Sequence, residues 1–123
     1  MTTLIPDASI ILKWSLESED EPDFQKALMI LEDYLAEKVD IFLPALWRYE
    51  VGNILGRKKP EMASEIFRIL LRYQFNEEPL DEAYSLQVLA LMREVKGISF
   101  YDASYHILAI RKHGFYVTAD RDY

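Results

Sequence analysis

Four acidic residues of this sequence occupy positions where strands are expected to end or helices to begin. Asp7 directly follows the first apolar run, and Asp120 lies two residues beyond the last expected strand, 115–118. Asp102 is expected at the start of a helix, whereas Glu50 lies within one. Because ligands of open parallel α/β sheets bind beyond the carboxyl ends of the strands, we expect Asp7 and Asp120 to share one edge. Such a set of hard oxygen ligands suits Mg²⁺ or Mn²⁺, which can activate water for attack on a phosphodiester.

Each acid also has a simpler structural interpretation. Asp7 and Asp102 are plausible helix N-caps, and for either residue taken alone that interpretation is favoured. Glu50 fits a solvated helix position, although it follows Trp47 by three residues and so borders the expected core side. Asp120 fits a turn, where Asp is common. No single one of the four therefore establishes a site.

Three other polar features of the sequence also have a structural interpretation. His106 follows Asp102 by one helical turn, which permits an Asp/His metal pair, but its apolar neighbours favour a histidine at the edge of the core. His113, beside Gly114, is expected to compensate the dipole at a helix end. The run Arg57-Lys58-Lys59 could grip phosphates, but a solvated helix end is the favoured interpretation.

The composition indicates a single globular domain. A chain of 123 residues can bury one core but not two, and a content of 50% hydrophobic residues argues against disorder. The lack of cysteine excludes disulfides, thiolate zinc sites and cysteine nucleophiles. No apolar run approaches the ~20 residues of a membrane span and no signal-peptide pattern is present, so we expect a soluble, cytoplasmic protein without membrane association. The net charge of −7 predicts that a nucleic-acid substrate binds only with the help of cations.

Apolar spacing and helix-boundary residues predict alternating strands and helices that would position the four acids. Strands are expected at 4–6, 40–43 and 115–118. Helices are expected after Asp7 or Ser9, from Pro22, over about 45–57, around 63–71, from Asp81 to Gly97, and from Asp102 to a C-cap at Gly114. This alternation predicts an α/β fold in which a short parallel sheet is flanked by helices on both faces.

The four acids lie in four short segments. These are LIPDASI (4–10, followed by Lys13-Trp14), PALWRYEVGN (44–53), FYDASY (100–105) and VTADRDY (117–123). Together they resemble the signatures of PIN-domain nucleases of the VapC toxin type. The matches fall in the family's order and span the chain, and four in order are far more specific than one. The resemblance implies a single PIN-like domain over residues 1–123.

The resemblance also implies a function and its ligands. It implies an endoribonuclease dependent on Mg²⁺ or Mn²⁺, in which Asp7, Glu50 and Asp102 are the best metal ligands and Asp120 supports a second ion. A metal-activated water would then hydrolyse RNA phosphodiesters. The resemblance further implies the toxin of a toxin–antitoxin pair, silenced by a cognate antitoxin whose tail enters the acidic groove. Such nucleases are often homodimers.

Four further residues are candidates to support this centre. Ser9, Asn53 and Thr118 could orient ligands or waters by hydrogen bonding, and Asn53 falls in a functional slot of the resembling family. For Ser9 and Thr118, local capping of the backbone is an equally good interpretation. Asp122 is a possible fifth acid.

Two other functional classes share features with this sequence. The resembling family usually continues through a further edge strand, whereas this sequence stops at Tyr123, so we expect that strand to be missing. This departure leaves open a catalytically silent PIN-like module that acts only by binding a protein partner, although the four acids favour the enzyme. A phosphotransfer receiver domain is rejected, because the strand at 40–43 ends in Pro44 and no suitable Lys follows the last strand.

Overall fold

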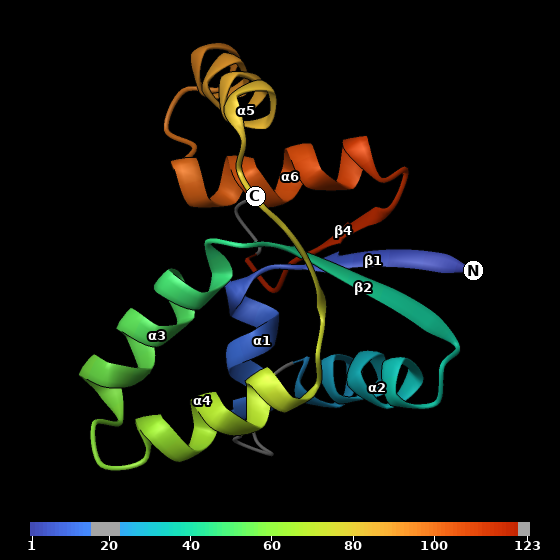
Figure 1. The fold of residues 1–123 in the computed structure, drawn as a ribbon, viewed down its shortest axis with the longest axis vertical. Coiled ribbons are helices and arrows are strands. Elements are labelled where there is room, and N and C mark those ends of the chain that lie inside the picture. The colour runs from blue at the N-terminus through green and yellow to red at the C-terminus, as the bar shows by residue number, and fades with distance from the viewer. Residues whose placement is uncertain (16–22, 121–123) are drawn as a thin grey trace.

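The computed structural model describes residues 1–15 and 23–120, which form a parallel four-stranded sheet with helices around it (Figure 1). The strands are β1 (Thr2–Pro6), β2 (Val39–Pro44), β3 (Asn76–Glu78) and β4 (Phe115–Val117), in the spatial order β3-β2-β1-β4. β1 pairs with both of its neighbours in parallel, with Leu4 beside Ile41 and Ile5 beside Tyr116. The two central strands are rich in Ile and Leu because both of their faces are covered, and Ile5, Ile41 and Leu43 are fully buried.

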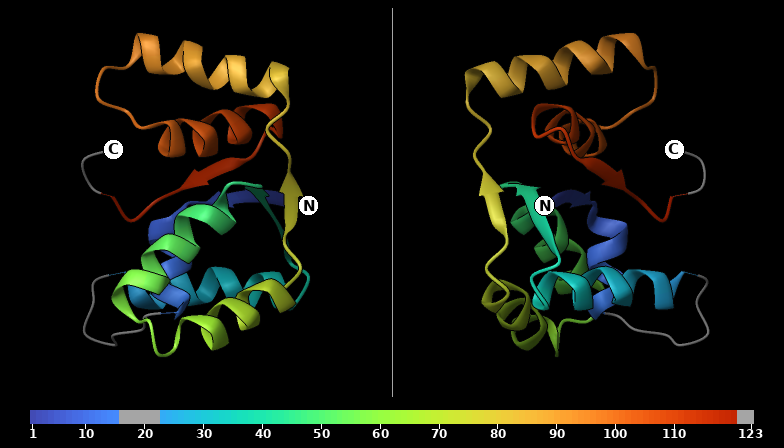
Figure 2. Two further views of the ribbon diagram at one scale, coloured as in Figure 1. Left: turned by 60° about the vertical axis from the view of Figure 1, so that its left-hand side comes forward. Right: turned by 90° about the vertical axis from the view of Figure 1, so that its right-hand side faces the viewer.

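Helices cover both faces of this sheet. They are α1 (Ala8–Ser15), α2 (Phe24–Leu35), α3 (Trp47–Lys58), α4 (Ala63–Arg72), α5 (Glu82–Glu94) and α6 (Phe100–Arg111). α5 and α6 lie on one side, where α6 contacts β1, β2 and β4, and α1 to α4 lie on the other (Figures 1 and 2). The predicted α/β fold with helices on both faces is therefore confirmed. In the described part of the chain, none of these helices is both long and apolar enough to span a membrane.

The core connects the two helix layers through the sheet. Its largest fully buried side chains are Trp47, Tyr84, Tyr105, Ile5, Ile11, Ile41, Leu43, Leu55, Leu70, Leu108, Val51 and Val88. Trp47 of α3 stacks on Phe67 of α4, with ring centroids 5.8 Å apart. On the other side, the Tyr84 hydroxyl of α5 donates a 2.5 Å hydrogen bond to the carbonyl of Ser104 in α6. Buried aromatic groups thus fix both helix pairs.

The C-terminal end of α6 differs from the prediction. Gly114 was expected to be the C-cap, but the cap is Lys112, and His113 takes the left-handed conformation with φ of 53°. The amide of Gly114 then donates to the carbonyl of Ala109 at 2.8 Å, as in a Schellman motif. Gly114 is needed for a different reason: a Cβ at this position would lie 2.7 Å from the carbonyl oxygen of Thr3. The glycine therefore allows the chain to pass close to β1.

Three other boundaries differ from the predictions. The helix expected to reach Gly97 ends at Glu94, and Gly97 has a φ of 88° in the turn that follows. The helix expected to open at Asp102 begins earlier, because Ser99 is its N-cap. The short strand β3 was not predicted at all. Pro22, the expected start of the second helix, lies outside the described residues.

Candidate active site

Asp7 connects the end of β1 to the start of α1 and is only 4% exposed. Its carbonyl accepts hydrogen bonds from the amides of Ile10 and Ile11, both at 3.1 Å, so its backbone begins the helix. Its Oδ1 accepts from the amide of Ser9 at 3.0 Å and from the Ser9 hydroxyl at 2.5 Å. Its Oδ2 accepts from the hydroxyl of Tyr116 at 2.9 Å. Local capping explains the hydrogen bonds of Oδ1 but not that of Oδ2, which comes from Tyr116 on a strand distant in the sequence.

The start of α1 is also bonded to the segment that follows β4. The amide of Asp7 donates to the carbonyl of Val117 at 3.0 Å, which extends the pairing of β1 with β4. The Ser9 hydroxyl, while donating to Asp7, accepts from the amide of Ala119 at 2.9 Å. Ser9 therefore binds Asp7 locally and also connects it to the segment leading to Asp120.

Glu50 lies in the first turn of α3, where it is partly buried. Its Oε1 accepts a 3.0 Å hydrogen bond from the hydroxyl of the fully buried Tyr105. Burial raises the pKa of Glu50 from 4.5 to about 7; the Tyr105 hydrogen bond opposes this rise, and the charges of Asp102 and Asp7 add to it. The same environment raises the pKa of Tyr105 well above its ordinary value, chiefly through burial and then through the charge of Glu50.

The start of α3 is held in place by β3, the strand that was not predicted. The Arg48 guanidinium binds both oxygens of Glu77, at 2.7 and 2.8 Å, and the indole of Trp47 donates to the same carboxylate. The hydrogen bond from Arg48 lowers the pKa of Glu77. This contact fixes the two residues that precede Tyr49 and Glu50, and so the position of the Glu50 backbone.

Asp102 occupies the third position of α6, where its amide donates to the N-cap hydroxyl of Ser99 at 3.0 Å. It is therefore not an N-cap itself. Burial raises the pKa of Asp102, as do the charges of Asp7 and Asp120, and a hydrogen bond with Ser99 opposes the rise. Asp7, Glu50, Asp102 and Asp120 are therefore linked electrostatically through their effects on Glu50 and Asp102.

Asp120 is exposed and follows β4. Its amide donates to the Thr118 hydroxyl at 3.0 Å, so Thr118 caps the local turn, one of the two roles considered for it. With Asp102, Asp120 lines a cavity of about 450 Å³ that also includes Lys96 and His106. The cavity lies where α5, α6 and the segment after β4 meet.

The donor chemistry of these acids fits a hard divalent cation. The charges of Asp7 and Asp102 raise the pKa of Glu50, and the charges of Asp7 and Asp120 raise the pKa of Asp102, so a cation between these carboxylates would relieve repulsion. Among the residues that the structure describes, no three Asp, Glu or His side chains are already grouped tightly enough to hold an ion. The fit to a cation therefore rests on the chemistry of the donors and not on a preformed cluster of ligands among the described residues.

The remaining candidates lie in different surroundings. Asn53 is exposed on α3, and within the described ranges no hydrogen bond joins it to the acids. His106 is partly buried with its ring 5.9 Å from that of Tyr116, so it lies at the core edge and beside the acids. Arg57 and Lys58 end α3 as exposed residues. Asp122 lies outside the described residues.

Sequence reasoning missed the groups that hold the acids in place. Tyr105 and Tyr116 were not singled out, although each donates to an acid. Tyr105 follows Asp102 by three residues and so shares its helix face, which is a signal available in the sequence. For Tyr116 the sequence offers only its place in a strand that ends near Asp120.

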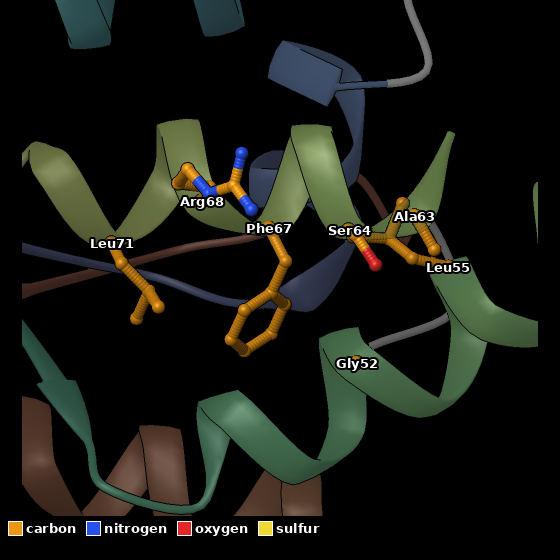
Figure 3. Close-up of a pocket in the computed structure, with 7 residues that line it drawn as sticks. All are labelled: Gly52, Leu55, Ala63, Ser64, Phe67, Arg68 and Leu71. Atoms are coloured by element: carbon orange, nitrogen blue, oxygen red, sulfur yellow. The ribbon is translucent and has the colours of Figure 1, made fainter. Parts of the chain in front are cut away.

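A second concave surface lies between α3 and α4, and none of the four acids lines it. Figure 3 shows this groove with its lining residues Gly52, Leu55, Ala63, Ser64, Phe67, Arg68 and Leu71. A Cβ at Gly52 would lie 3.3 Å from the Phe67 ring, so the glycine lets α4 pack closely on α3. The groove is mostly apolar, in contrast to the acidic site.

Comparisons with known proteins agree with this arrangement. A family model described as PIN domain matches residues 4–123. The fold is similar to VapC20 of Mycobacterium tuberculosis, a sarcin–ricin-loop-cleaving toxin, with 16% identity, a TM-score of 0.72, and coverage of 97% of this chain and 91% of that one. It is also similar to a chain of VapBC2 from Rickettsia felis bound to a DNA fragment from their promoter, with 15% identity, a TM-score of 0.70, and coverage of 97% and 88%. No curated protein sequence matches the chain.

Proposed function

Because the chain belongs to the PIN-domain family, we propose that it is a metal-dependent endoribonuclease whose catalytic centre is formed by Asp7, Glu50, Asp102 and Asp120. One observation carries this proposal. The charges of Asp7 and Asp102 raise the pKa of Glu50, and those of Asp7 and Asp120 raise the pKa of Asp102. A purely structural role would not require four carboxylates from separate elements to repel one another.

The four carboxylates would hold Mg²⁺ or Mn²⁺, since both prefer oxygen ligands. When bound, such an ion lowers the pKa of a coordinated water and stabilises charge on the phosphate. The side chains of the chain itself do the positioning. Asp7 is fixed by Ser9 and Tyr116, and Glu50 by Tyr105. Deprotonation of Glu50, which has a pKa of about 7 without metal, would accompany cation binding.

We further propose RNA as the substrate and a cognate antitoxin as the partner, with a homodimer as the assembly. The similar VapC20 is a toxin that cleaves the sarcin–ricin loop, and the similar VapBC2 is a complex bound to promoter DNA. The net charge of −7 fits an RNA substrate only if cations mediate its binding at the acidic site. These points support the toxin half of a VapBC-type pair.

The proposal is tested by digestion of total RNA with and without Mg²⁺, with cleavage sites mapped by sequencing of the 5′ ends. The Asp7→Asn variant is expected to lower the rate of Mg²⁺-dependent cleavage at least about 100-fold, because a ligand charge is lost with little change in shape. Asp33→Asn, the same change on α2, serves as the matched control and is expected to cleave like the wild type.

Two results would count against the proposal. Cleavage that persists unchanged in Asp7→Asn would point to a contaminant or to another site. Wild-type protein that is folded and Mg²⁺-loaded yet cuts no RNA would favour the module that acts only by binding a partner.

A further inference from the structure

Two tyrosine hydroxyls reach into the group of acids. Tyr105 on α6 donates to Oε1 of Glu50 at 3.0 Å, and Tyr116 on β4 donates to Oδ2 of Asp7 at 2.9 Å. Tyr105 is fully buried and Tyr116 is partly buried, so core packing fixes both rings. The carboxylates therefore meet donors whose positions are set by the fold.

The hydrogen bonds leave each carboxylate able to bind a cation. A carboxylate accepts at about four lone-pair sites. Asp7 uses three of them, for the amide and hydroxyl of Ser9 and for Tyr116. Glu50 receives a hydrogen bond from Tyr105 on Oε1. Each side chain is thus restrained while an oxygen remains available as a ligand, and restraint before binding lowers the entropy lost when the ion binds.

Each tyrosine also shares a segment with a second acid. Tyr105 lies three residues after Asp102 on the same helix, and Tyr116, in β4, lies four residues before Asp120. The bond from Tyr105 therefore sets the spacing between Glu50 and the helix of Asp102. The bond from Tyr116 sets the spacing between Asp7 and the segment of Asp120. The two hydroxyls connect the four acids in two pairs.

We propose that Tyr105 and Tyr116 are positioning residues that set the spacing of these two acid pairs and so raise the affinity of the centre for a divalent cation. The inference rests on the proposed metal-dependent function. It adds a role that follows from the hydroxyl groups alone, because phenylalanine would fill the same space without donating a hydrogen bond.

The experiment compares Tyr105→Phe and Tyr116→Phe with the wild type in two measurements. Mn²⁺ affinity is measured by electron paramagnetic resonance of the free ion, and stability is measured by urea unfolding in EDTA. Each variant is expected to bind Mn²⁺ about 10-fold more weakly. The matched control is Tyr34→Phe, whose hydroxyl donates to the carbonyls of Tyr73 and Gln74, and its Mn²⁺ affinity is expected to stay within about twofold of the wild type.

A rescue measurement separates positioning from direct metal ligation. Raising the Mn²⁺ concentration is expected to restore RNA cleavage in Tyr116→Phe, where the ligands are intact, but not in Asp7→Asn, where a ligand is lost. Cleavage by Tyr116→Phe that saturating Mn²⁺ leaves depressed would overturn the positioning role.

The other outcomes are equally decisive. Folded tyrosine variants that bind Mn²⁺ as tightly as the wild type overturn the inference and leave the metal centre standing. An equal loss of affinity in Tyr34→Phe shows a general effect of losing a tyrosine hydroxyl and also overturns the inference. A wild type that binds no Mn²⁺ refutes the proposed metal-dependent function, and the inference falls with it. If Tyr105→Phe does not fold, the partly buried Tyr116 decides the question.

Discussion

Replacing Glu50 by glutamine is expected to stabilise the metal-free protein above neutral pH and to leave its stability in acid nearly unchanged. Burial raises the pKa of Glu50 from 4.5 to about 7. The charges of Asp102 and Asp7 add to this rise, and the hydrogen bond from Tyr105 opposes it. The folded state therefore prefers the protonated carboxyl. The stability from this group is fully present below about pH 4.5 and is lost as the pH rises through about 7.

The size of the effect follows from the same pKa. A change from 4.5 to about 7 corresponds to about 3 kcal/mol for a fully desolvated carboxyl, at about 1.4 kcal/mol for each pH unit. Because Glu50 is only partly buried, solvent screening reduces this to about 1–2 kcal/mol. For a domain of this length, that free energy corresponds to a rise of about 3–8 °C in Tm. Glutamine has no such proton to lose, and its amide oxygen still accepts the Tyr105 bond.

The assay is thermal unfolding in EDTA at pH 4 and pH 8, for the wild type and Glu50→Gln. The other acids titrate in both proteins, so the difference in Tm between wild type and variant reports the contribution of Glu50. Glu61→Gln, at an exposed position, serves as the control and is expected to show no such difference. Addition of Mg²⁺ at pH 8 is expected to raise the Tm of the wild type more than that of Glu50→Gln. A variant that is less stable than the wild type at pH 8, or a difference that does not depend on pH, would refute the reasoning.

Two further predictions concern the elements that position the site. Gly114→Ala is expected to lower the free energy of unfolding by about 1–3 kcal/mol, because its Cβ would lie 2.7 Å from the carbonyl oxygen of Thr3. Gly56 is a helical position where an added Cβ would meet nothing within 4 Å, so Gly56→Ala is expected to raise the free energy of unfolding by about 0.5–1 kcal/mol. If the same urea titration showed both glycine variants to be stabilised, or both destabilised, the steric argument would be contradicted. Ser99→Ala is expected to cost about 1 kcal/mol through loss of the α6 cap and to weaken Mn²⁺ binding through Asp102, whereas Ser99→Thr keeps the cap. Unchanged urea midpoints in Ser99→Ala would show that the cap is not needed.

Much of the fold follows from local patterns in the sequence. The strands around Ile5 and Ile41 were recognisable as short apolar runs, and the helices by their apolar spacing. β3 escaped prediction because its three residues, Asn76–Glu78, are polar and lie at a sheet edge, where no buried face imposes an apolar pattern. The role of Glu77 depends on contacts that form only in the folded protein, with Arg48 and with the indole of Trp47.

The acids of the candidate site could be chosen from the sequence, but their supports could not. Asp7 and Asp120 were placed by the general rule for strand ends, which needs no knowledge of pairing. The bond from Tyr116 depends on β4 lying next to β1 with Ile5 in register beside it, and this neighbour relation is not encoded in either strand alone. The capping role of Ser99 was visible as a serine three residues before an acid, but the carboxylate of Asp102 was given that role instead.

The pairing of β1 with β4 has a consequence for how the protein comes to be active. The hydrogen bond between Tyr116 and Asp7 closes a loop of 109 residues, and the bond between Ala119 and Ser9 closes one of 110. We expect contacts so far apart along the chain to form late, since the entropy of closing the loop must be overcome before they contribute. A partly synthesised or partly folded chain thus lacks the acidic centre while β1 still presents an open edge. Completion of the sheet covers that edge and assembles the centre in the same step.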